Sequence, residues 1–136
     1  MKIILLIGIL CFCLMPVRSQ NFIGMKEDRI RDAMASENPG MTVDTRVKND
    51  SFRYLKYLSD RENETWLIFL DEKGRCNGVR ITYDNSMMET KVREMKEIYR
   101  QNGSDRWSDG SGNDEVTITL KRDLSFFSVT WERVRQ

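Results

Sequence analysis

The sequence predicts an α+β domain in which two helices pack on one face of an antiparallel sheet. Two amphipathic segments with helical period stand between groups of shorter segments with strand-like apolar patterns. Short turns join most of the predicted strands, and strands joined in this way pair antiparallel. The predicted order is α-β-β-β-β-α-β-β-β, so each half has a helix followed by strands, which suggests a structural repeat.

A central hairpin is predicted over residues 65–83. Residues 65–70 form a continuous apolar run, typical of a strand that is covered on both faces. Residues 75–83 alternate apolar and polar side chains, which is the period of a half-buried strand. Gly74 lies in the loop between them and supplies the positive φ that a tight turn needs.

The first helix is expected over residues 26–37 and ends at Asn38-Pro39-Gly40. Its predicted apolar face consists of Ile30, Ala33 and Met34. An edge strand is expected within residues 41–47. A second strand is expected over residues 51–59, and it carries apolar groups on both of its faces.

The second helix is predicted over residues 86–101, where Ser86 and Glu89 fit a capping box and Asn102-Gly103 ends the helix. Its apolar stripe consists of Met88, Val92, Met95 and Tyr99, widened by Ile98. The polar, glycine-rich residues 104–115 are interpreted as a loop.

Two strands of the second half are assigned, to residues 115–121 and 124–134. The last strand is predicted to place Phe126 on one side and a larger apolar set on the other. That larger set is Phe127, Val129 and Trp131.

Residues 1–19 resemble a secretory signal peptide, with a basic start, an apolar stretch over residues 3–15 and a small residue, Ser19, at the expected cleavage site. An uncleaved anchor is the alternative, but the apolar stretch is short of the roughly 20 residues that span a bilayer. Because Cys11 and Cys13 lie in the apolar stretch, a lipoprotein signal is a further alternative. The bulky residues Leu10 and Phe12 disfavour it, since a lipid-attachment signal normally has a small residue before the cysteine. Export to the periplasm or outside the cell is therefore expected.

Residues 20–136 are long enough for a single α+β domain with one core. Without Lys2 and Arg18 the chain keeps 20 of its 22 basic residues against 21 acidic residues. This balance gives no reason to expect nucleic acid or an anionic membrane as a partner. The oligomeric state stays open.

Cys76 is the one cysteine that follows the predicted cleavage site. It is interpreted as a small buried hydrophobe. If it is instead exposed, we expect a disulfide-linked dimer in an oxidising compartment.

The chemistry of the chain argues against most catalytic classes, because the sequence has no histidine. That excludes Ser-His-Asp and Cys-His nucleophile pairs, and no glycine-rich phosphate loop is present. A calcium-binding EF-hand loop beginning at Asp109 is excluded. Such a loop needs glycine at its sixth position and glutamate at its twelfth, and these positions hold Asp114 and Leu120. No catalytic residue, metal or cofactor is assigned. A pair of carboxylates can still supply acid and base, so a carboxylate-dependent hydrolase of the cell envelope is the alternative function.

Aromatic residues are the candidates for an interaction surface. Most aromatics on predicted strands are expected in the core, whereas Trp107 lies in a polar, glycine-rich setting and is interpreted as a surface anchor. The candidate interaction residues are Trp107, Tyr54 and Cys76.

Two resemblances bear on fold and location. Phe22-Ile23-Gly24-Met25, followed by a helix with Ile30, resembles the start of the repeat in β-lactamase-inhibitor-like proteins and small outer-membrane assembly lipoproteins. These are periplasmic or secreted binding modules with helices on an antiparallel sheet. The chain also resembles a group of small secreted proteins of Bacteroidetes-type bacteria, which has no established activity and so implies location and fold only. The segments that carry this second resemblance are Phe22-Ile23-Gly24, Tyr54-Leu55-Lys56-Tyr57, Leu67-Ile68-Phe69-Leu70 with Cys76, Val79-Arg80, Tyr83-Asp84 and Arg106-Trp107.

Taken together, these observations predict an exported, non-catalytic binding or accessory domain whose partner is an envelope protein. A purely structural envelope component is a third class, and it would fractionate with membranes.

Overall fold

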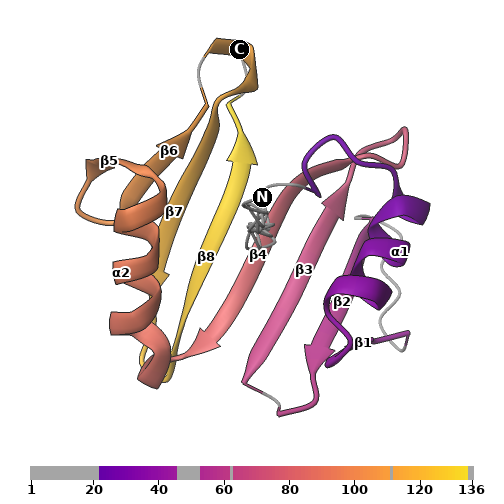
Figure 1. Ribbon diagram of the computed structural model, residues 1–136, viewed down its shortest axis with the longest axis horizontal. Coiled ribbons are helices and arrows are strands. Elements are labelled where there is room, and N and C mark those ends of the chain that lie inside the picture. The colour runs from indigo at the N-terminus through magenta and orange to yellow at the C-terminus, as the bar shows by residue number, and fades with distance from the viewer. Residues whose placement is uncertain (1–21, 46–52, 62, 111, 135–136) are drawn as a thin grey trace, which may run out of the picture.

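The computed structural model describes residues 22–45, 53–61, 63–110 and 112–134. The predicted signal peptide, residues 1–19, lies outside the described residues. The predicted α+β class is confirmed, since the chain forms one antiparallel sheet with helices on one of its faces (Figure 1). In the described ranges no helix is long and apolar enough to cross a membrane.

The elements of the two halves follow the same order. The first half consists of α1 (Glu27–Glu37), β1 (Met41–Val43), β2 (Tyr54–Ser59), β3 (Glu64–Leu70) and β4 (Cys76–Asp84). The second half consists of the 3-10 helix η2 (Asn85–Met87), α2 (Met88–Ile98), β5 (Arg100–Gly103), β6 (Arg106–Asp109), the 3-10 helix η3 (Gly112–Asp114), β7 (Val116–Arg122) and β8 (Phe126–Arg133).

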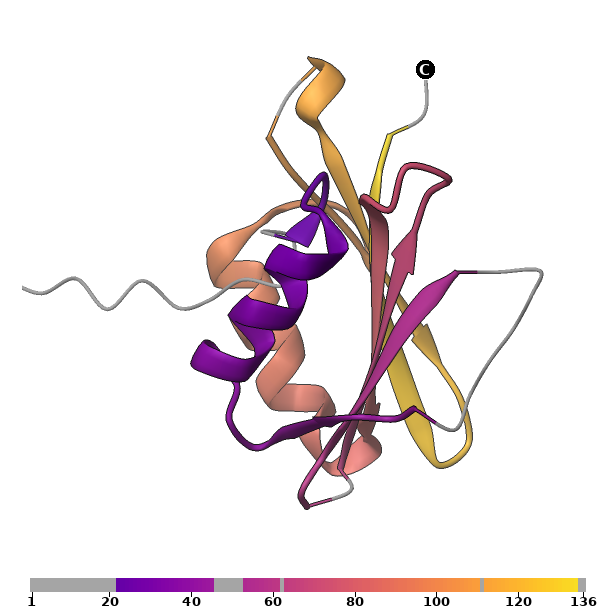
Figure 2. The same ribbon diagram turned by 90° about the vertical axis from the view of Figure 1, so that its right-hand side faces the viewer.

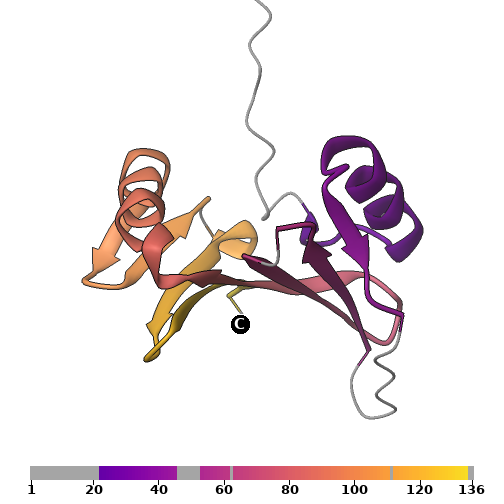
Figure 3. The same ribbon diagram turned by 90° about the horizontal axis from the view of Figure 1, so that it is seen from below.

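The sheet has eight strands in the order β1-β2-β3-β4-β8-β7-β6-β5. Each half is thus a helix followed by four consecutive strands, and the two halves meet where β4 pairs with β8. The arrangement is that of a repeat, with one helix over each half of the sheet (Figure 3). The prediction of three strands in the second half is wrong, because residues 104–115 hold β6 instead of only a loop.

Both helices lie on the same side of the sheet (Figure 2). Alternation along the strands turns one set of side chains toward them, and cross-strand pairs such as Trp66 with Ile81 and Ile81 with Val129 keep that set together. α1 contributes Ile30 and Met34, as its predicted apolar face requires. The other large buried apolar residues include Phe22, Ile68, Val79, Trp107, Ile118 and Phe127.

The central hairpin is confirmed, with β3 and β4 joined by a turn in which Gly74 has φ +71°. The carboxylate of Asp71 accepts hydrogen bonds from the backbone N–H groups of Lys73 and Arg75 and so fixes the turn. The prediction that β3 is covered on both faces is wrong. No helix of the described residues lies over its second face, where Leu67 and Phe69 stay partly exposed.

The start of the second helix differs from the predicted capping box. The carboxylate of Asp84 accepts the N–H of Ser86 at 2.8 Å, and this hydrogen bond lowers the pKa of Asp84. A 3-10 turn then leads into α2, whose N-cap residue Met87 makes no side-chain hydrogen bond. Asp84 is the better acceptor because it stands at the point where extended backbone turns into the helix.

The end of the second helix also differs from the prediction. α2 ends at Ile98, and Tyr99 is already extended, so Asn102-Gly103 falls within β5. Met95 and Tyr99 are buried as expected, but Ile98 is 38 % exposed and does not widen the apolar stripe. Residues 100–103 pair with β6 instead of extending the helix, because the tertiary pairing outweighs their helix propensity.

Candidate functional site

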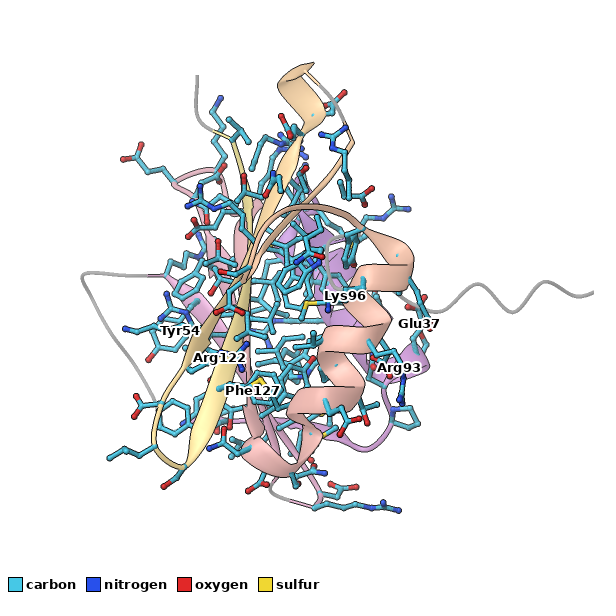
Figure 4. The ribbon with its side chains drawn as sticks, turned by 90° about the vertical axis from the view of Figure 1, so that its left-hand side faces the viewer. Glu37, Tyr54, Arg93, Lys96, Arg122 and Phe127 are labelled. Atoms are coloured by element: carbon cyan, nitrogen blue, oxygen red, sulfur yellow. The ribbon has the colours of Figure 1, made fainter. Side chains whose placement is uncertain are left out.

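The second face of the sheet, called the open face below, carries the other half of the alternating side chains. Its residues include Tyr54, Lys56 and Leu58 of β2, Thr65, Leu67 and Phe69 of β3, Gly78, Arg80 and Thr82 of β4, Phe126, Ser128, Thr130 and Glu132 of β8, Thr117, Thr119 and Lys121 of β7, and Arg106 and Ser108 of β6. Figure 4 shows Tyr54 on this side of the sheet, while Arg93, Lys96 and Glu37 lie on the helix side.

One row of cross-strand neighbours runs through the middle of the open face. Arg80 pairs with Thr130, Thr130 with Thr119, and Thr119 with Arg106. Each pair stands on adjacent strands, so the row places two hydroxyl groups between two guanidinium groups. This row is called the Arg–Thr–Thr–Arg row below.

A groove of about 890 Å³ lies along this part of the open face. The groove contacts β3, β4, β6, β7 and β8. It therefore draws on residues from both halves of the chain. The residues that line it are Arg53, Phe69, Leu70, Asp71, Glu72, Asn77, Gly78, Arg80, Arg106, Thr117, Thr119, Glu132, Arg133 and Val134.

Arg80 is held in place on the groove by two contacts. Its guanidinium carbon lies 5.8 Å from the centre of the Phe69 ring, which is within the range of a cation–π contact. Its Nε donates to the hydroxyl of Thr130 at 3.3 Å. These contacts engage the Nε of Arg80 and the face of its guanidinium group that lies against the Phe69 ring. The two terminal nitrogens of Arg80 therefore remain able to bind an anionic group.

Gly78 forms part of the groove floor between Phe69 and Glu132. A Cβ at this position would lie 3.4 Å from the carbonyl oxygen of Trp131 and 3.8 Å from Cδ2 of Phe69, both ordinary contacts. The missing side chain therefore leaves space in the groove rather than relieving a clash.

Charged side chains at one end of the groove are already paired. Arg53 donates to Glu27 at 2.6 Å, and Arg31 donates to the other oxygen of the same carboxylate at 2.9 Å. Hydrogen bonds from Arg31 and then Arg53 lower the pKa of Glu27 against the opposing effect of its burial. Asp71 is engaged by the turn described above. These four groups are therefore less available to a ligand than the guanidinium groups of the Arg–Thr–Thr–Arg row.

Apolar side chains continue the open face beside the groove. The rings of Tyr54 and Phe69 are neighbours on β2 and β3, with centres 6.4 Å apart and planes tilted by 58°. Leu58 and Leu67 are also half-buried, and neither described α-helix lies above them. Tyr54 thus remains a candidate interaction residue.

Trp107 is not a surface anchor, and this prediction is wrong. Its side chain is 0 % exposed, because β6 alternates and turns it to the helix side, opposite Ile118. The strand holds only four residues between glycine-rich turns, which hid its alternation in the sequence. Its indole Nε1 is buried without a hydrogen-bond partner, as is that of Trp131.

Cys76 is a buried free thiol, as its preferred interpretation predicted. Burial raises its pKa to about 11, and Sγ lies 3.4 Å from the carbonyl oxygen of Gly78. The exposure that a disulfide-linked dimer requires is absent, so Cys76 is not an interaction residue.

The sequence analysis missed the arginines and threonines of the groove. The alternation in residues 75–83 does place Arg80 on the other face of the strand from Val79 and Ile81, so the sequence could have predicted that Arg80 faces away from the core. It could not show that Arg106 joins the same row, because Arg106 lies on a strand that was not predicted.

Within the described ranges, no group of three or more histidine, cysteine, aspartate or glutamate residues lies close enough to hold a metal ion. Comparisons of the chain with family models, curated proteins and solved structures find no match. The two resemblances stated above therefore remain expectations.

Proposed function

We propose that the protein is an exported, non-catalytic binding module that recognises a partner in the cell envelope through the open face of its sheet. One observation supports this most directly. β2 and β3 carry apolar side chains on both faces, yet the α-helices that the structure describes, α1 and α2, cover only one of those faces.

An antiparallel sheet with one solvated face usually alternates apolar and polar residues. Here Tyr54, Leu58, Leu67 and Phe69 interrupt that rule on the open face. Apolar side chains grouped at the surface mark interaction sites in many proteins. Their place next to arginines and threonines gives the mixture of apolar and polar groups that is typical of binding surfaces.

The edges of the sheet are less suited to binding than its face. β1 has three residues, and β5 has four residues with a bulge between Gln101 and Gly103. Short and irregular edge strands hinder the addition of another strand. The open face is therefore a larger and more regular surface for a partner than either edge of the sheet.

A carboxylate-dependent hydrolase uses as its general acid a carboxylic acid whose pKa is raised. The carboxyl groups of Glu27 and Asp84 have pKa values shifted in the opposite direction. Neither group suits the role of a general acid, and the binding module is the function that we propose.

The proposal is tested by introducing a photo-crosslinking amino acid at one position at a time in the producing cells. Thr119 and Tyr54 report on the open face, and Arg93 and Lys96 on α2 report on the opposite side (Figure 4). We expect a discrete adduct from the open-face positions and none from the α2 positions. Adducts from the α2 positions alone, or none from any position, would contradict the proposal.

Export is tested by the mass of the protein recovered outside the cytoplasm. We expect a chain that begins at Gln20, as cleavage after Ser19 predicts. A full-length chain confined to the cytoplasm would contradict export, while the crosslinking result would still decide the binding surface.

A further inference from the structure

We infer that the groove binds an extended polypeptide segment with two carboxylates four residues apart. This inference rests on the proposed function, because it names the partner chemistry for the same face. Its basis is the Arg–Thr–Thr–Arg row, together with the charges and rings that surround it.

The spacing of the row fits an extended chain. Arg80 and Arg106 stand on strands β4 and β6, which are three strand spacings apart through β8 and β7. Three spacings correspond to about 14 Å. Side chains on one side of an extended chain repeat every ~6.8 Å, so residues four apart are ~13.6 Å apart. A segment that crosses the strands can therefore place one carboxylate at each guanidinium.

Both guanidinium groups are available for such carboxylates. In the described part of the chain, neither Arg80 nor Arg106 forms an ion pair with a carboxylate. Arg80 is also oriented in advance by Phe69 and Thr130, which reduces the ordering that binding requires. Arginine suits carboxylates because its planar fork donates two parallel hydrogen bonds.

The middle of the segment would face hydroxyl groups. Thr130 and Thr119 lie between the two arginines, and Thr117 extends the same surface. A hydroxyl both donates and accepts, so it can bind the backbone or a polar side chain of the segment. At the β3 end, Leu67 supplies an apolar contact beside Arg80.

Glu132 favours separated carboxylates over a continuous polyanion. It lines the groove on β8, between the strands that carry Arg80 and Arg106. An anionic polysaccharide with a charge on every unit would place a carboxylate near Glu132, and like charges repel. A peptide with neutral residues between its two acids avoids this repulsion.

The aromatic rings also favour a peptide over a sugar chain. A sugar-binding platform needs a flat ring face that is free, but Arg80 covers one face of Phe69. Tyr54 packs against Phe69 at a tilt of 58°. These rings therefore suit contacts with aliphatic side chains better than stacking against the face of a sugar ring.

The test measures binding of fluorescent synthetic peptides to the purified protein by fluorescence anisotropy. The first peptide alternates threonine and valine and carries two glutamates four positions apart. The second replaces both glutamates by glutamine, and the third places them two positions apart. A fluorescent polygalacturonate oligomer serves as the anionic sugar probe.

We expect the first peptide to bind at least about tenfold more tightly than the second and third. Arg80→Ala and Arg106→Ala should each weaken its binding about tenfold. Arg93→Ala removes the same charge from α2 and should leave binding unchanged. Glu132→Gln should strengthen binding by several fold, because it removes a repelling charge. Thermal melting of every variant checks that the fold is kept.

Several outcomes would overturn the inference. These are equal binding of the glutamate and glutamine peptides, no effect of Arg106→Ala in a folded variant, or binding of the sugar probe without the peptide. Crosslinks from the open face to a partner that lacks a segment with this spacing would overturn it while leaving the proposed function in place. Absence of all open-face crosslinks would instead remove the proposed function itself.

Discussion

At the scale of single residues, Glu27 shows how one carboxylate can join a helix to a strand end. It accepts hydrogen bonds from Arg31 within α1 and from Arg53 just before β2. Its side chain is 25 % exposed, so solvent weakens but does not abolish these interactions. Its lowered pKa shows that the folded state favours the charged form.

Glu27→Gln should therefore lower the free energy of unfolding by about 0.5–1 kcal/mol at neutral pH. Since the folded pKa is lowered, the contribution is complete above the unfolded value of 4.5 and disappears as the pH falls through the folded pKa. Urea unfolding across this range should show the two curves converging in acid. Asp28→Asn, in the same helical turn, is the control. A difference that persists unchanged in acid would contradict the ion-pair explanation.

Cys76 gives a second prediction at this scale. Because its thiol is buried and its pKa is about 11, little thiolate forms at neutral pH and reagents have poor access. Thiol-specific labelling should be slow in buffer and fast in denaturant. The native protein should migrate as a monomer on a non-reducing gel. Rapid labelling of the folded protein would show that the site is exposed.

Trp107 is buried at the contact between β6 and the core. Trp107→Ala should cost about 3–5 kcal/mol of stability, as deletion of a large core aromatic usually does. Arg106→Ala is the matched control on the same strand, where the side chain is exposed, and it should stay within about 0.5 kcal/mol of the native protein. Denaturant unfolding measures the free energy of unfolding of the two variants, and the difference between them shows whether Trp107 is a core residue. A cost for Trp107→Ala as small as that of its neighbour would restore its interpretation as a surface anchor.

At the scale of elements, the β7–β8 turn is tied to the start of the second half. Nδ2 of Asn85 donates to the carbonyl oxygen of Leu124 at 3.0 Å, and Asp123 closes the turn by donating its N–H to Phe126. Leu124 itself is 97 % exposed. The turn is thus held by hydrogen bonds to its backbone, one of them from the Asn85 side chain, while the exposed Leu124 side chain adds no packing.

Asn85→Ala should consequently cost about 1 kcal/mol, because it removes a side-chain hydrogen bond across two elements. Faster hydrogen exchange should be confined to residues near Leu124. Leu124→Ser is the control and should change stability by less than about 0.5 kcal/mol. Equal effects of the two substitutions would contradict this role for Asn85.

At the scale of the whole molecule, the groove exists because strands from both halves of the chain share one sheet. β4 closes the first half and pairs with β8, which closes the second. Gly78 keeps the floor open at this junction, and its pair partner is Glu132. A side chain at Gly78 should therefore block the groove without disturbing the core.

Gly78→Val should abolish crosslinking from Thr119 while changing stability by no more than about 1 kcal/mol, because valine favours strands. Gly40→Val, outside the groove, provides the control, since a Cβ there meets only Asp60 at 3.7 Å. Crosslinking and thermal melting are measured on both variants. Undiminished crosslinking in a folded Gly78→Val protein would show that the groove is not where the partner binds.

Local patterns in the sequence were enough to predict the fold class, the first helix and the central hairpin. Each of these follows from local periodicity or from a single turn residue such as Gly74. The apolar pattern of β2 and β3 was also visible, although its second face was interpreted as covered. Local patterns carry this information because side chains alternate with the geometry of the strand itself.

Which face of the sheet stays open, and which side chains meet there, depends instead on how distant strands pair. The sequence separates Arg80 from Arg106 and Thr130, and pairing of β4 with β8 and of β6 with β7 places all three in one row. Trp107 lay in a strand too short to be recognised until its partners β5 and β7 were in place. Cross-strand register depends on contacts between distant segments, and residues close in sequence carry little information about it.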